Sequence, residues 1–556
     1  MVSSNGQRNS IWVSDFETTT LAEDCRVWAW AICNVEDTRI VEIGKDLDSY
    51  MTRICQTSST HYFHNLAFDG SFIIDWLFRQ GFKHSTARGP KKREFTTLIS
   101  NTAKFYSITV TWRNGHTTEF RDSLKKLPMS VSNIARAFKL EDTKGELDYR
   151  LERPVGWEPT AEEREYIRKD AVIVAQALKI ELDAGMTKLT VGADSLAEYK
   201  RISGTTWFNR MFPVLPDSMD AEIRKAYRGG FTYADDRFKQ RLLGKGKTYD
   251  VNSLYPSVMY DRVLPFGEPV FFEGFPEPTE LHPLFLVSIT FTATLKKDHI
   301  PCIQIKGNSQ FVATDYLEVI DEPTTLMVTS VDLALWEDHY DLEIHAYNGG
   351  WLFKGIRGVF DKFIDKWMGV KTTSEGGMRE IAKLHLNSLY GKFATNPNVT
   401  GKVPVFEDDV VKLRTGEEET RPPVYTAMGV FITAYARDVT IRAAQANYDV
   451  FAYADTDSLH LMTWEEPVGI DVDPLKLGAW KLEYAFDAAL FWRAKTYTEH
   501  VPKKGYVTHI AGMPGMIAKQ VTFEDYVDGK KFPGKLLPKR VPGGIVLEDV
   551  TFTLKT

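Results

Sequence analysis

The chain has 556 residues, 43% of them hydrophobic and 26% charged, and its 68 basic and 75 acidic residues give a formal net charge of −7. This length predicts three to five domains or subdomains, and the balanced composition excludes a disordered or low-complexity protein. The four cysteines lack Cys-x-x-Cys spacing, which disfavours a zinc ribbon and a disulfide scaffold and favours a reducing cytoplasm. The start of the chain shows no apolar leader segment, and no run of about 18 apolar residues occurs, so secretion and membrane insertion are not expected.

Acidic residues recur along the first third of the chain. Asp15 and Glu17 stand two positions apart in the alternating stretch 11–19, so a strand there presents both carboxylates on one face. Asp69 supplies a third carboxylate just before a predicted helix at residues 72–79. Each of these acids taken alone is more often an ordinary surface residue, and only their combination indicates a site.

A longer helix is predicted farther along the chain. Thr160 and Glu163 form a capping box, a pairing that opens many helices. Tyr166 and Asp170 follow four positions apart and therefore share one face of that helix. Four carboxylates and a tyrosine on one strand and two helices predict a hydrolytic site with two divalent ions, one activating water and one stabilising the leaving oxygen.

A second group of carboxylates begins at Asp250. This residue follows the short run 247–249, and Pro256 indicates a strand-to-turn junction after it. Asp455 and Asp457 lie two positions apart in an aromatic and β-branched setting, where a strand or hairpin directs both to one face. Like charges this close repel one another, and a hard divalent cation relieves the repulsion. Three such carboxylates suit phosphoryl transfer with a pair of Mg²⁺ ions, whereas a lone Asp-x-Asp is most often a solvated turn.

The stretch 375–393 between these carboxylates has the period of a helix. The residues of its polar stripe are Arg379, Lys383, Asn387 and Tyr390. Two cations on one helix face suit the triphosphate of a nucleotide, because charge-assisted bonds to phosphate are strong. Gly391 is expected to stop or turn the chain there. The alternative is an amphipathic surface helix with a solvated basic side.

Two inserted segments and one basic run complete the pattern. The segments are residues 262–360, rich in aromatics and prolines, and residues 398–423. In the second, the glycine and charge cluster at 416–421 predicts a protruding hairpin tip; the alternative is a solubilising surface loop. The run 530–540 carries five basic residues and no acid, for which we expect phosphate contact although such runs are most often solvated surface.

Three segments together resemble motifs A, B and C of the family B DNA polymerases. They are Asp250-Val251-Asn252-Ser253-Leu254-Tyr255-Pro256, Lys383-Leu384-His385-Leu386-Asn387-Ser388-Leu389-Tyr390-Gly391 and Tyr453-Ala454-Asp455-Thr456-Asp457-Ser458. The resemblance implies metal ligands at Asp250, Val251 (through its carbonyl), Asp455 and Asp457. The nucleotide contacts that it implies are Tyr255, Lys371, Arg379, Lys383, Asn387 and Tyr390. Within that set, Tyr255 would be the steric gate that excludes a 2′-hydroxyl.

Contacts to the polymerised DNA follow from two further resemblances. Tyr227-Arg228-Gly229-Gly230 resembles the family's linker motif, in which the glycines approach template phosphates and the arginine pairs with one. Lys495-Thr496-Tyr497 resembles the Lys-x-Tyr motif that stabilises the primer terminus. The full set of expected DNA contacts in this part of the chain is Tyr227, Arg228, Gly229, Gly230, Gly391, Lys495, Tyr497, Lys530, Lys531 and Lys535.

The amino-terminal acids resemble, in the same order, the Exo I, II and III motifs of the DEDDy-type 3′–5′ exonucleases. The metal ligands implied by this resemblance are Asp15, Glu17, Asp69 and Asp170. The residues that would hold the single-stranded 3′ end are Asn65, Phe68, Ser123 and Leu124. Tyr166 would assist the attacking water, and Lys144 would stabilise the leaving phosphate.

The resemblance covers nearly the whole chain and extends to the protein-primed polymerases of the phi-twenty-nine group of tailed phages, in which the two inserts correspond to the regions TPR1 and TPR2. It implies a multidomain α+β and α/β fold, with a ribonuclease H-like exonuclease domain and a right-hand polymerase. The expected parts are an exonuclease domain at 1–190, palm at 191–261 and 424–526, TPR1-like insert at 262–360, fingers at 361–397, TPR2-like insert at 398–423 and thumb at 527–556.

The implied function is a DNA-directed DNA polymerase with a proofreading exonuclease, using two Mg²⁺ ions per active site, for which Mn²⁺ can substitute. Its expected partners are primer-template DNA, dNTPs, a terminal protein that serves as primer and a single-stranded-DNA-binding protein. We expect a monomer in the cytoplasm of an infected bacterial host, with no membrane partner. Two alternatives stay open: a polymerase of the same family that extends ordinary nucleic-acid primers, and a non-catalytic DNA-binding replication scaffold.

Overall fold

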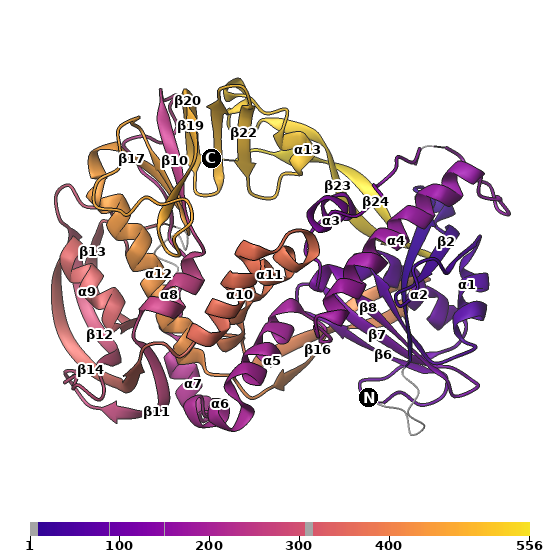
Figure 1. The fold of residues 1–556 in the computed structure, drawn as a ribbon, viewed down its shortest axis with the longest axis horizontal. Helices are drawn as coiled ribbons and strands as arrows, with labels where there is room; N and C mark the ends of the chain where they lie inside the picture. Colours follow the sequence, from indigo (N-terminus) through magenta and orange to yellow (C-terminus); the bar gives the residue numbers. More distant parts are fainter. Residues whose placement is uncertain (1–8, 88, 150, 306–314, 556) are drawn as a thin grey trace.

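The computed structural model describes residues 9–87, 89–149, 151–305 and 315–555, and the strands within these ranges form six sheets connected by helices (Figure 1). The polar start of the chain and residues 306–314 of the first insert lie outside the described residues. In the view of Figure 1 the amino-terminal domain lies on the right and the central sheet at the upper left, and the C-terminal strands extend between them along the top. None of the described helices is long and apolar enough to cross a membrane.

The amino-terminal domain contains an eight-stranded sheet in the order β3-β2-β1-β4-β8-β7-β6-β5. Its strands are β1 Ser10–Thr18, β2 Val27–Asn34, β3 Val41–Gly44, β4 Ser59–Phe63, β5 Lys83–His84, β6 Glu94–Ile99, β7 Phe105–Thr111 and β8 Thr117–Asp122. Its helices are α1 Leu47–Ile54, α2 Leu66–Arg79, α3 Val131–Phe138 and α4 Ala161–Asp183. One hydrophobic cluster packs α2 on one face of the sheet, and a second packs α4 on the other. On β1, Phe16 belongs to the first cluster and Val13 to the second, as the alternation of a strand requires.

Helix α2 begins six residues earlier than the predicted 72–79. Asn65 adopts a left-handed conformation with φ 83°, which turns the chain from β4 directly into the helix. Asp69 therefore lies in the first turn of α2 and not in a loop before it. The capping box that opens α4 is confirmed, because the Thr160 and Glu163 side chains each bond the other residue's backbone N–H.

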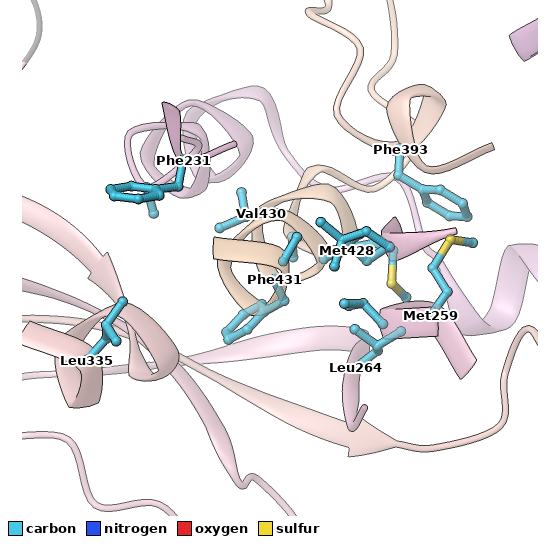
Figure 2. Packing of buried hydrophobic residues seen from close by; sticks show 14 of the residues in the cluster. Phe231, Met259, Leu264, Leu335, Phe393, Met428, Val430 and Phe431 are labelled. Carbon is cyan, nitrogen blue, oxygen red and sulfur yellow. The ribbon is translucent and has the colours of Figure 1, made fainter. Parts of the chain in front are cut away.

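The central sheet has the strand order β19-β10-β18-β17-β9. Its strands are β9 Thr232–Ala234, β10 Gly246–Val251, β17 Phe451–Asp455, β18 Ser458–Leu461 and β19 Trp480–Phe486, and its associated helices are α8 Leu254–Asp261 and α12 Thr426–Ala446. Helix α12 is buried on nearly all sides and is the centre of the largest hydrophobic cluster. Figure 2 shows Met428, Val430 and Phe431 of α12 spread around that helix, among Met259 and Leu264.

The first insert contains a four-stranded sheet, β11-β14-β12-β13, and one helix. These elements are β11 Leu264–Phe272, β12 Leu284–Leu295, β13 Val319–Thr329, α9 Ser330–His339 and β14 Tyr340–Ile356. The second insert is a hairpin of β15 Asn398–Glu407 and β16 Val410–Thr420, called here the second-insert hairpin. Its tip is not at 416–421, as predicted, but at Asp408 and Asp409, which both have positive φ and form the tight two-residue turn. Residues 416–420 belong to β16 instead.

Five helices lie between the amino-terminal domain, the central sheet and the inserts. They are α5 Val191–Ser203, α6 Thr205–Met211, α7 Asp217–Arg224, α10 Asp361–Thr373 and α11 Gly376–Phe393. Helix α11 covers the predicted stretch, but Gly391 lies inside it and does not end it.

The C-terminal strands form a three-stranded sheet, β20 Ala488–Arg493, β21 Thr496–Val501 and β22 Gly505–Ile510, followed by α13 Gly515–Ala518 and a hairpin of β23 Lys531–Val541 and β24 Gly544–Thr553. We call them the C-terminal sheet and the C-terminal hairpin. One hydrophobic cluster joins Leu490, Ile517 and Phe532 across both. The C-terminal unit therefore extends back to β20 and is larger than the expected thumb at 527–556.

Helix α2 of the amino-terminal domain meets the tips of both hairpins. Arg79 donates to an Asp75 carboxylate oxygen at 2.6 Å and to Asp409, at the tip of the second-insert hairpin, at 2.7 Å. The other Asp75 oxygen accepts from the backbone N–H of Gly543, in the turn of the C-terminal hairpin, at 3.3 Å. Strands β16 and β23 also lie side by side. The two hairpins therefore contact each other as well as helix α2 of the amino-terminal domain.

A buried ion pair joins the first insert to α12. Arg437 on α12 donates to both Asp332 oxygens, the shortest bonds being 2.8 Å, and both side chains are about 95% buried. The same guanidinium donates to the carbonyls of Arg228 at 2.7 Å and Gly229 at 2.9 Å. It therefore fixes the segment before β9 as well as α9.

We predict that Arg437→Met destabilises the protein by about 3–5 kcal/mol, because it leaves the buried Asp332 carboxylate without its cation, with only the Thr329 hydroxyl bonded to it. The matched control is Arg442→Met on the same helix, whose half-exposed side chain pairs with Asp338 at 2.9 Å and is worth at most about 1 kcal/mol. Melting temperatures measured by calorimetry compare the two, and equal losses would contradict the role of the buried pair.

Candidate active sites: two carboxylate centres

Asp250 and Asp457 meet at one end of the central sheet. Asp250 lies on β10 opposite Ser458 of β18, and Asp457 lies in the turn after β17, where Thr456 has φ 61°. The Val251 N–H donates to the Asp457 carbonyl at 2.8 Å and ties the two segments together. Burial, then the Asp457 charge and the Glu483 charge, raise the pKa of Asp250 to about 7. Burial and the Asp455 charge likewise raise the pKa of Asp457.

The chain after Asp250 differs from the predicted strand-to-turn junction. Ser253, with φ 57°, makes the turn, and α8 starts at Leu254. Pro256 therefore lies in the first turn of a helix, where its missing N–H costs nothing.

Asp455 is held by the C-terminal sheet. Lys495 donates to both of its oxygens, at 2.7 and 2.9 Å, and the Thr232 hydroxyl donates to one of them at 2.9 Å. Both oxygens are thus engaged in this structure, and metal binding by Asp455 stays a prediction. Asp455 links the C-terminal sheet to the central sheet.

Two charged residues near Asp250 were missed by the sequence analysis. Lys481 of β19 is directly across from Asp250 in the sheet, and Glu483 is two positions farther on. The two side chains form an ion pair at 2.8 Å. Their alternation in Lys481-Leu482-Glu483 is a weak strand signal, but nothing in the sequence shows that β19 pairs with β10.

A group of cations lies beside the Asp250–Asp457 pair. Lys371 on α10 donates to the Ser253 hydroxyl at 2.9 Å. Its pKa is lowered by burial and then by the charges of Lys383, Arg379 and Lys481, so these four cations converge on one region. Lys383 is balanced by Glu380 at 2.6 Å. A convergence of cations near two carboxylates suits a polyanion bound together with divalent ions.

The Tyr255 and Tyr390 rings stack with their centroids 3.9 Å apart and their planes at 13°. Asn387 lies one turn before Tyr390 on α11. Gly391 was expected to stop the chain, but it continues the helix. A side chain at Gly391 would meet no atom within 4 Å, so the space beside it is open.

The Tyr227–Gly230 segment has a structural role that the sequence did not indicate. The Arg228 guanidinium donates to the Met327 carbonyl at 3.0 Å and lies 5.5 Å from the Trp336 ring, and burial lowers its pKa to about 10. The Arg228 guanidinium is therefore engaged within the protein in this structure, and its pairing with a template phosphate stays a prediction. A Cβ at Gly230 would lie 2.7 Å from the Thr456 hydroxyl, so Gly230 makes room for the turn that carries Asp457.

The expected primer-end residues lie where the C-terminal sheet meets the central sheet. Lys495 holds Asp455, and its backbone N–H donates to the Tyr453 hydroxyl at 2.9 Å. Tyr497 is only 7% exposed and packs on Tyr453, with ring centroids 4.8 Å apart, and on His509. Tyr497 is thus mainly a packing residue of this interface, whereas Lys495 is more than half exposed.

Much of the basic run 530–540 is engaged within the protein. Lys530 pairs with Asp525 at 3.4 Å, and Lys535 lies 5.2 Å from the Phe552 ring. Arg540 donates to the Ser71 hydroxyl of α2 at 3.1 Å. Lys531 is exposed and is the member of the run best placed to meet solvent-borne phosphate.

The amino-terminal centre gathers the predicted acids between β1, α2 and α4. Burial and the Asp170 charge raise the pKa of Asp15 to about 7, while Lys144 opposes this. Burial and then the Asp15 charge raise the pKa values of Glu17 and Asp69. Lys144 donates to one Asp170 oxygen at 2.7 Å.

The aromatic residue of this centre has a partner that the sequence did not reveal. The Tyr166 and Tyr149 hydroxyls bond each other at 2.8 Å. Tyr149 stands in an irregular segment before α4, where no periodicity marks it.

The four residues expected to hold a single-stranded end divide into two kinds. Asn65 is exposed and Phe68 is half-buried at the start of α2, and Leu124 is half-buried. Ser123 is fully buried, and its hydroxyl donates to the Phe63 carbonyl at 3.0 Å and bonds the His64 Nδ1 at 3.1 Å. Ser123 therefore holds the loop in this structure, and its contact with a single strand stays a prediction.

Both centres have the donors that a divalent cation prefers. One oxygen each of Asp69 and Asp170 is buried without a hydrogen-bond partner, and hard carboxylate oxygens suit Mg²⁺. Within the described ranges, no three acidic, histidine or cysteine side chains are already arranged as a complete ion site. The acids therefore fit the cation chemically, but their side chains converge without a finished coordination shell.

We predict that Asp250→Asn stabilises the metal-free protein at pH 8. With a pKa of about 7 in the folded protein against an ordinary 3.8, the ionised carboxylate is disfavoured by folding, so stability falls as pH rises from about 4 through 7. Asparagine removes that loss, and the difference from the parent should vanish toward pH 4. Melting temperatures in a chelator across this range test it, with Asp321→Asn at an exposed strand position as control. A difference independent of pH would contradict the assignment.

Known DNA polymerases resemble this chain over nearly its whole length. A family model described as DNA polymerase type B, organellar and viral, matches residues 51–153 and 144–473. The DNA polymerase of Bacillus phage phi29 is 47% identical over 97% of this chain and 98% of its own length, and that of Streptococcus phage Cp-1 is 32% identical over 98% of both. A structure of phi29 DNA polymerase with primer-template DNA and incoming nucleotide matches with a TM-score of 0.94 at 46% identity, covering 99% of this chain and all of that one.

These similarities confirm the fold class and the family that the sequence motifs predicted. The family requires divalent metal ions, which agrees with the acidic character of both centres. The chain belongs to the type B DNA polymerases of organelles and viruses, and it is a DNA-directed DNA polymerase of the phi29 type with 3′–5′ exonuclease activity.

Proposed function

We propose that this chain replicates a linear phage-type genome by protein-primed initiation and strand displacement, with synthesis at the Asp250–Asp457 pair and editing at the amino-terminal centre. The observation that carries the proposal is the presence of two separate carboxylate centres in one chain: among the described residues, four cations lie beside the first, whereas Lys144 lies beside the second. Synthesis needs to hold a triphosphate, whereas editing needs to hold a single-stranded end.

In synthesis, Lys371, Lys383 and Arg379 hold the triphosphate of the dNTP and place its α-phosphate at the Asp250–Asp457 pair. Lys481, directly across from Asp250, contributes a fourth charge. Tyr255, stacked on Tyr390, forms the floor beneath the sugar and leaves no room for a 2′-hydroxyl. Asp455 and Lys495 orient the primer end, since they join the C-terminal sheet to the same edge of the central sheet.

Asp250, Asp457 and the Val251 carbonyl would hold two Mg²⁺ ions for synthesis, with Mn²⁺ able to substitute. Asp15, Glu17, Asp69 and Asp170 would hold two for editing. When bound, the ions activate the attacking hydroxyl or water and stabilise the charge on the leaving oxygen. The raised pKa values of Asp250 and Asp15 mean that these residues bind protons near neutral pH until a cation replaces them.

In editing, Asn65, Phe68 and Leu124 line the way to the acids and hold the single-stranded 3′ end. Lys144, bonded to Asp170, neutralises the phosphate that is cleaved. The Tyr166 hydroxyl, held by Tyr149, orients the attacking water.

Strand displacement follows from enclosure of the DNA. The second-insert hairpin and the C-terminal hairpin both reach α2 through Asp75 and Arg79, so the template can pass only through a space bounded by protein. The non-template strand cannot follow, and each nucleotide addition drives the separation of the next base pair, which costs on average about 1.4 kcal/mol in stacking.

The partners are primer-template DNA and dNTPs, with which phi29 DNA polymerase forms a ternary complex, together with a terminal protein as primer and a single-stranded-DNA-binding protein. We place the enzyme, as a monomer, in the cytoplasm of an infected bacterial host.

Transfer of a labelled nucleotide to a protein hydroxyl distinguishes protein priming from the alternative of an ordinary nucleic-acid primer.

Two matched substitutions test the division of labour. We expect Asp457→Asn to reduce primer extension about 10²–10³-fold while leaving 3′–5′ degradation of single-stranded DNA unchanged, because the two centres lie in separate domains. Asp15→Asn should do the reverse.

Extension and degradation are measured on labelled oligonucleotides with both proteins, and each variant is the control for the other. Extension by Asp457→Asn at a tenth of the parent rate, or loss of both activities in either variant, would show that the sites have been assigned wrongly.

A further inference from the structure

Glu499 is a carboxylate buried completely at the interface between the central sheet and the C-terminal sheet. It lies on β21, two positions after Tyr497 and therefore on the same strand face. Neither the family motifs nor the activities described above assign it a role. Complete burial of an ionised group is costly unless it is fully hydrogen-bonded, so its partners indicate what it does.

Three donors from three adjacent strands of the central sheet surround Glu499. One of its oxygens accepts from the Thr248 hydroxyl at 3.0 Å and bonds the His460 Nδ1 at 2.8 Å, and the other accepts from the Tyr484 hydroxyl at 2.9 Å. Thr248 pairs directly with His460 on one side and Tyr484 on the other. The three form one row across β18, β10 and β19, and a single carboxylate is bonded to all three.

This row is next to the synthesis centre. Thr248 is two positions before Asp250 on β10 and thus shares its face of the sheet. His460 is opposite Tyr453, whose hydroxyl accepts from the Lys495 backbone N–H at 2.9 Å. Strand β21 is therefore joined to the central sheet at two points. Just before the strand, Lys495 forms an ion pair with Asp455; in the middle of the strand, Glu499 bonds the row of three residues.

We propose that Glu499 is a positioning residue for the primer end. It holds the C-terminal sheet in one register on the central sheet, so that Lys495 stays on Asp455 beside the Asp250–Asp457 pair. The primer terminus is then retained for synthesis in preference to transfer to the editing centre. The proposal rests on the assignment of synthesis to Asp250 and Asp457.

Chemistry explains why a carboxylate is needed at this position. Two oxygens with several lone pairs can accept from a hydroxyl, an imidazole N–H and a phenol at once, and bonds to an ionised acceptor are about twice as strong as neutral ones. An amide has one acceptor oxygen, and its NH₂ group faces a donor. Glu499→Gln therefore keeps the size of the side chain but leaves at least one buried donor unsatisfied.

The test compares Glu499→Gln with Thr498→Val. Thr498 is the adjacent residue of β21; it is equally buried, but it faces away from the central sheet and bonds Thr508 and Tyr526 at 2.8 Å. The measurements are kcat and KM for dNTP on a matched primer-template, the dNTP concentration at which synthesis balances degradation, and degradation of single-stranded DNA.

For Glu499→Gln we expect kcat to fall about tenfold and the dNTP concentration at which synthesis balances degradation to rise about tenfold. A change of this size corresponds to the loss of one hydrogen bond to a charged group. The KM for dNTP should change less than about twofold, because the cations of α10 and α11 are untouched, and degradation of single strands should not change. Thr498→Val should leave all of these at parent values.

A Glu499→Gln protein with parent values, or equal shifts in both variants, would overturn the proposal. If Glu499→Gln does not fold, Tyr484→Phe removes a single donor near the edge of the row and should shift the same balance in the same direction; an unchanged balance there would overturn the proposal too. Failure of the synthesis assignment itself is recognised separately, because Asp457→Asn would then retain extension in the same assay.

Discussion

The ion pair of Asp75 and Arg79 on helix α2 is the point at which distant parts of the chain meet. Asp75 is almost fully buried, and its two oxygens serve Arg79 and the Gly543 N–H. Arg79 in turn reaches Asp409 and lies 5.2 Å from the Phe406 ring. An isolated exposed pair would contribute little, but this one is part of a network with a buried member and aromatic packing. Both hairpins end at this pair, so the proposed enclosure of the DNA depends on it.

The second constraint is electrostatic. Each candidate centre collects buried carboxylates, and burial, followed by the repulsion between them, raises the pKa values of Asp15 and Asp250 to about 7. Nearby lysines, Lys144 in one centre and Lys481 in the other, relieve only part of this repulsion. The remainder is the driving force for binding divalent ions. The two centres lie on separate sheets, and in the proposed division of labour the interface that carries Lys495 and Glu499 biases which of them receives the 3′ end.

Local patterns predicted the parts of the sites that depend on spacing along the chain. The alternation at Asp15 and Glu17 and the capping box of α4 both appear as expected, since each is fixed by neighbours in sequence. What the sequence could not show depends on contacts across long separations. Arg228 bonds the Met327 carbonyl and lies near the Trp336 ring, and both residues are about a hundred positions away in sequence. Asp455 likewise pairs with the distant Lys495. The tip of the second-insert hairpin was misplaced because a charge cluster was taken for a turn, whereas the positive φ of two aspartates makes it.

The product length from a single binding event on a primed circle, with competitor DNA present as a trap, tests the closure at α2 most directly. Arg79→Ala removes the partner of Asp409 and weakens the hold on both hairpin tips; Lys412→Ala, which breaks an exposed pair with Asp408 on the same hairpin, is the matched control. The account predicts shorter products and lost strand displacement for Arg79→Ala alone, with the rate per nucleotide on single-stranded template unchanged. Products of parent length from Arg79→Ala would contradict it.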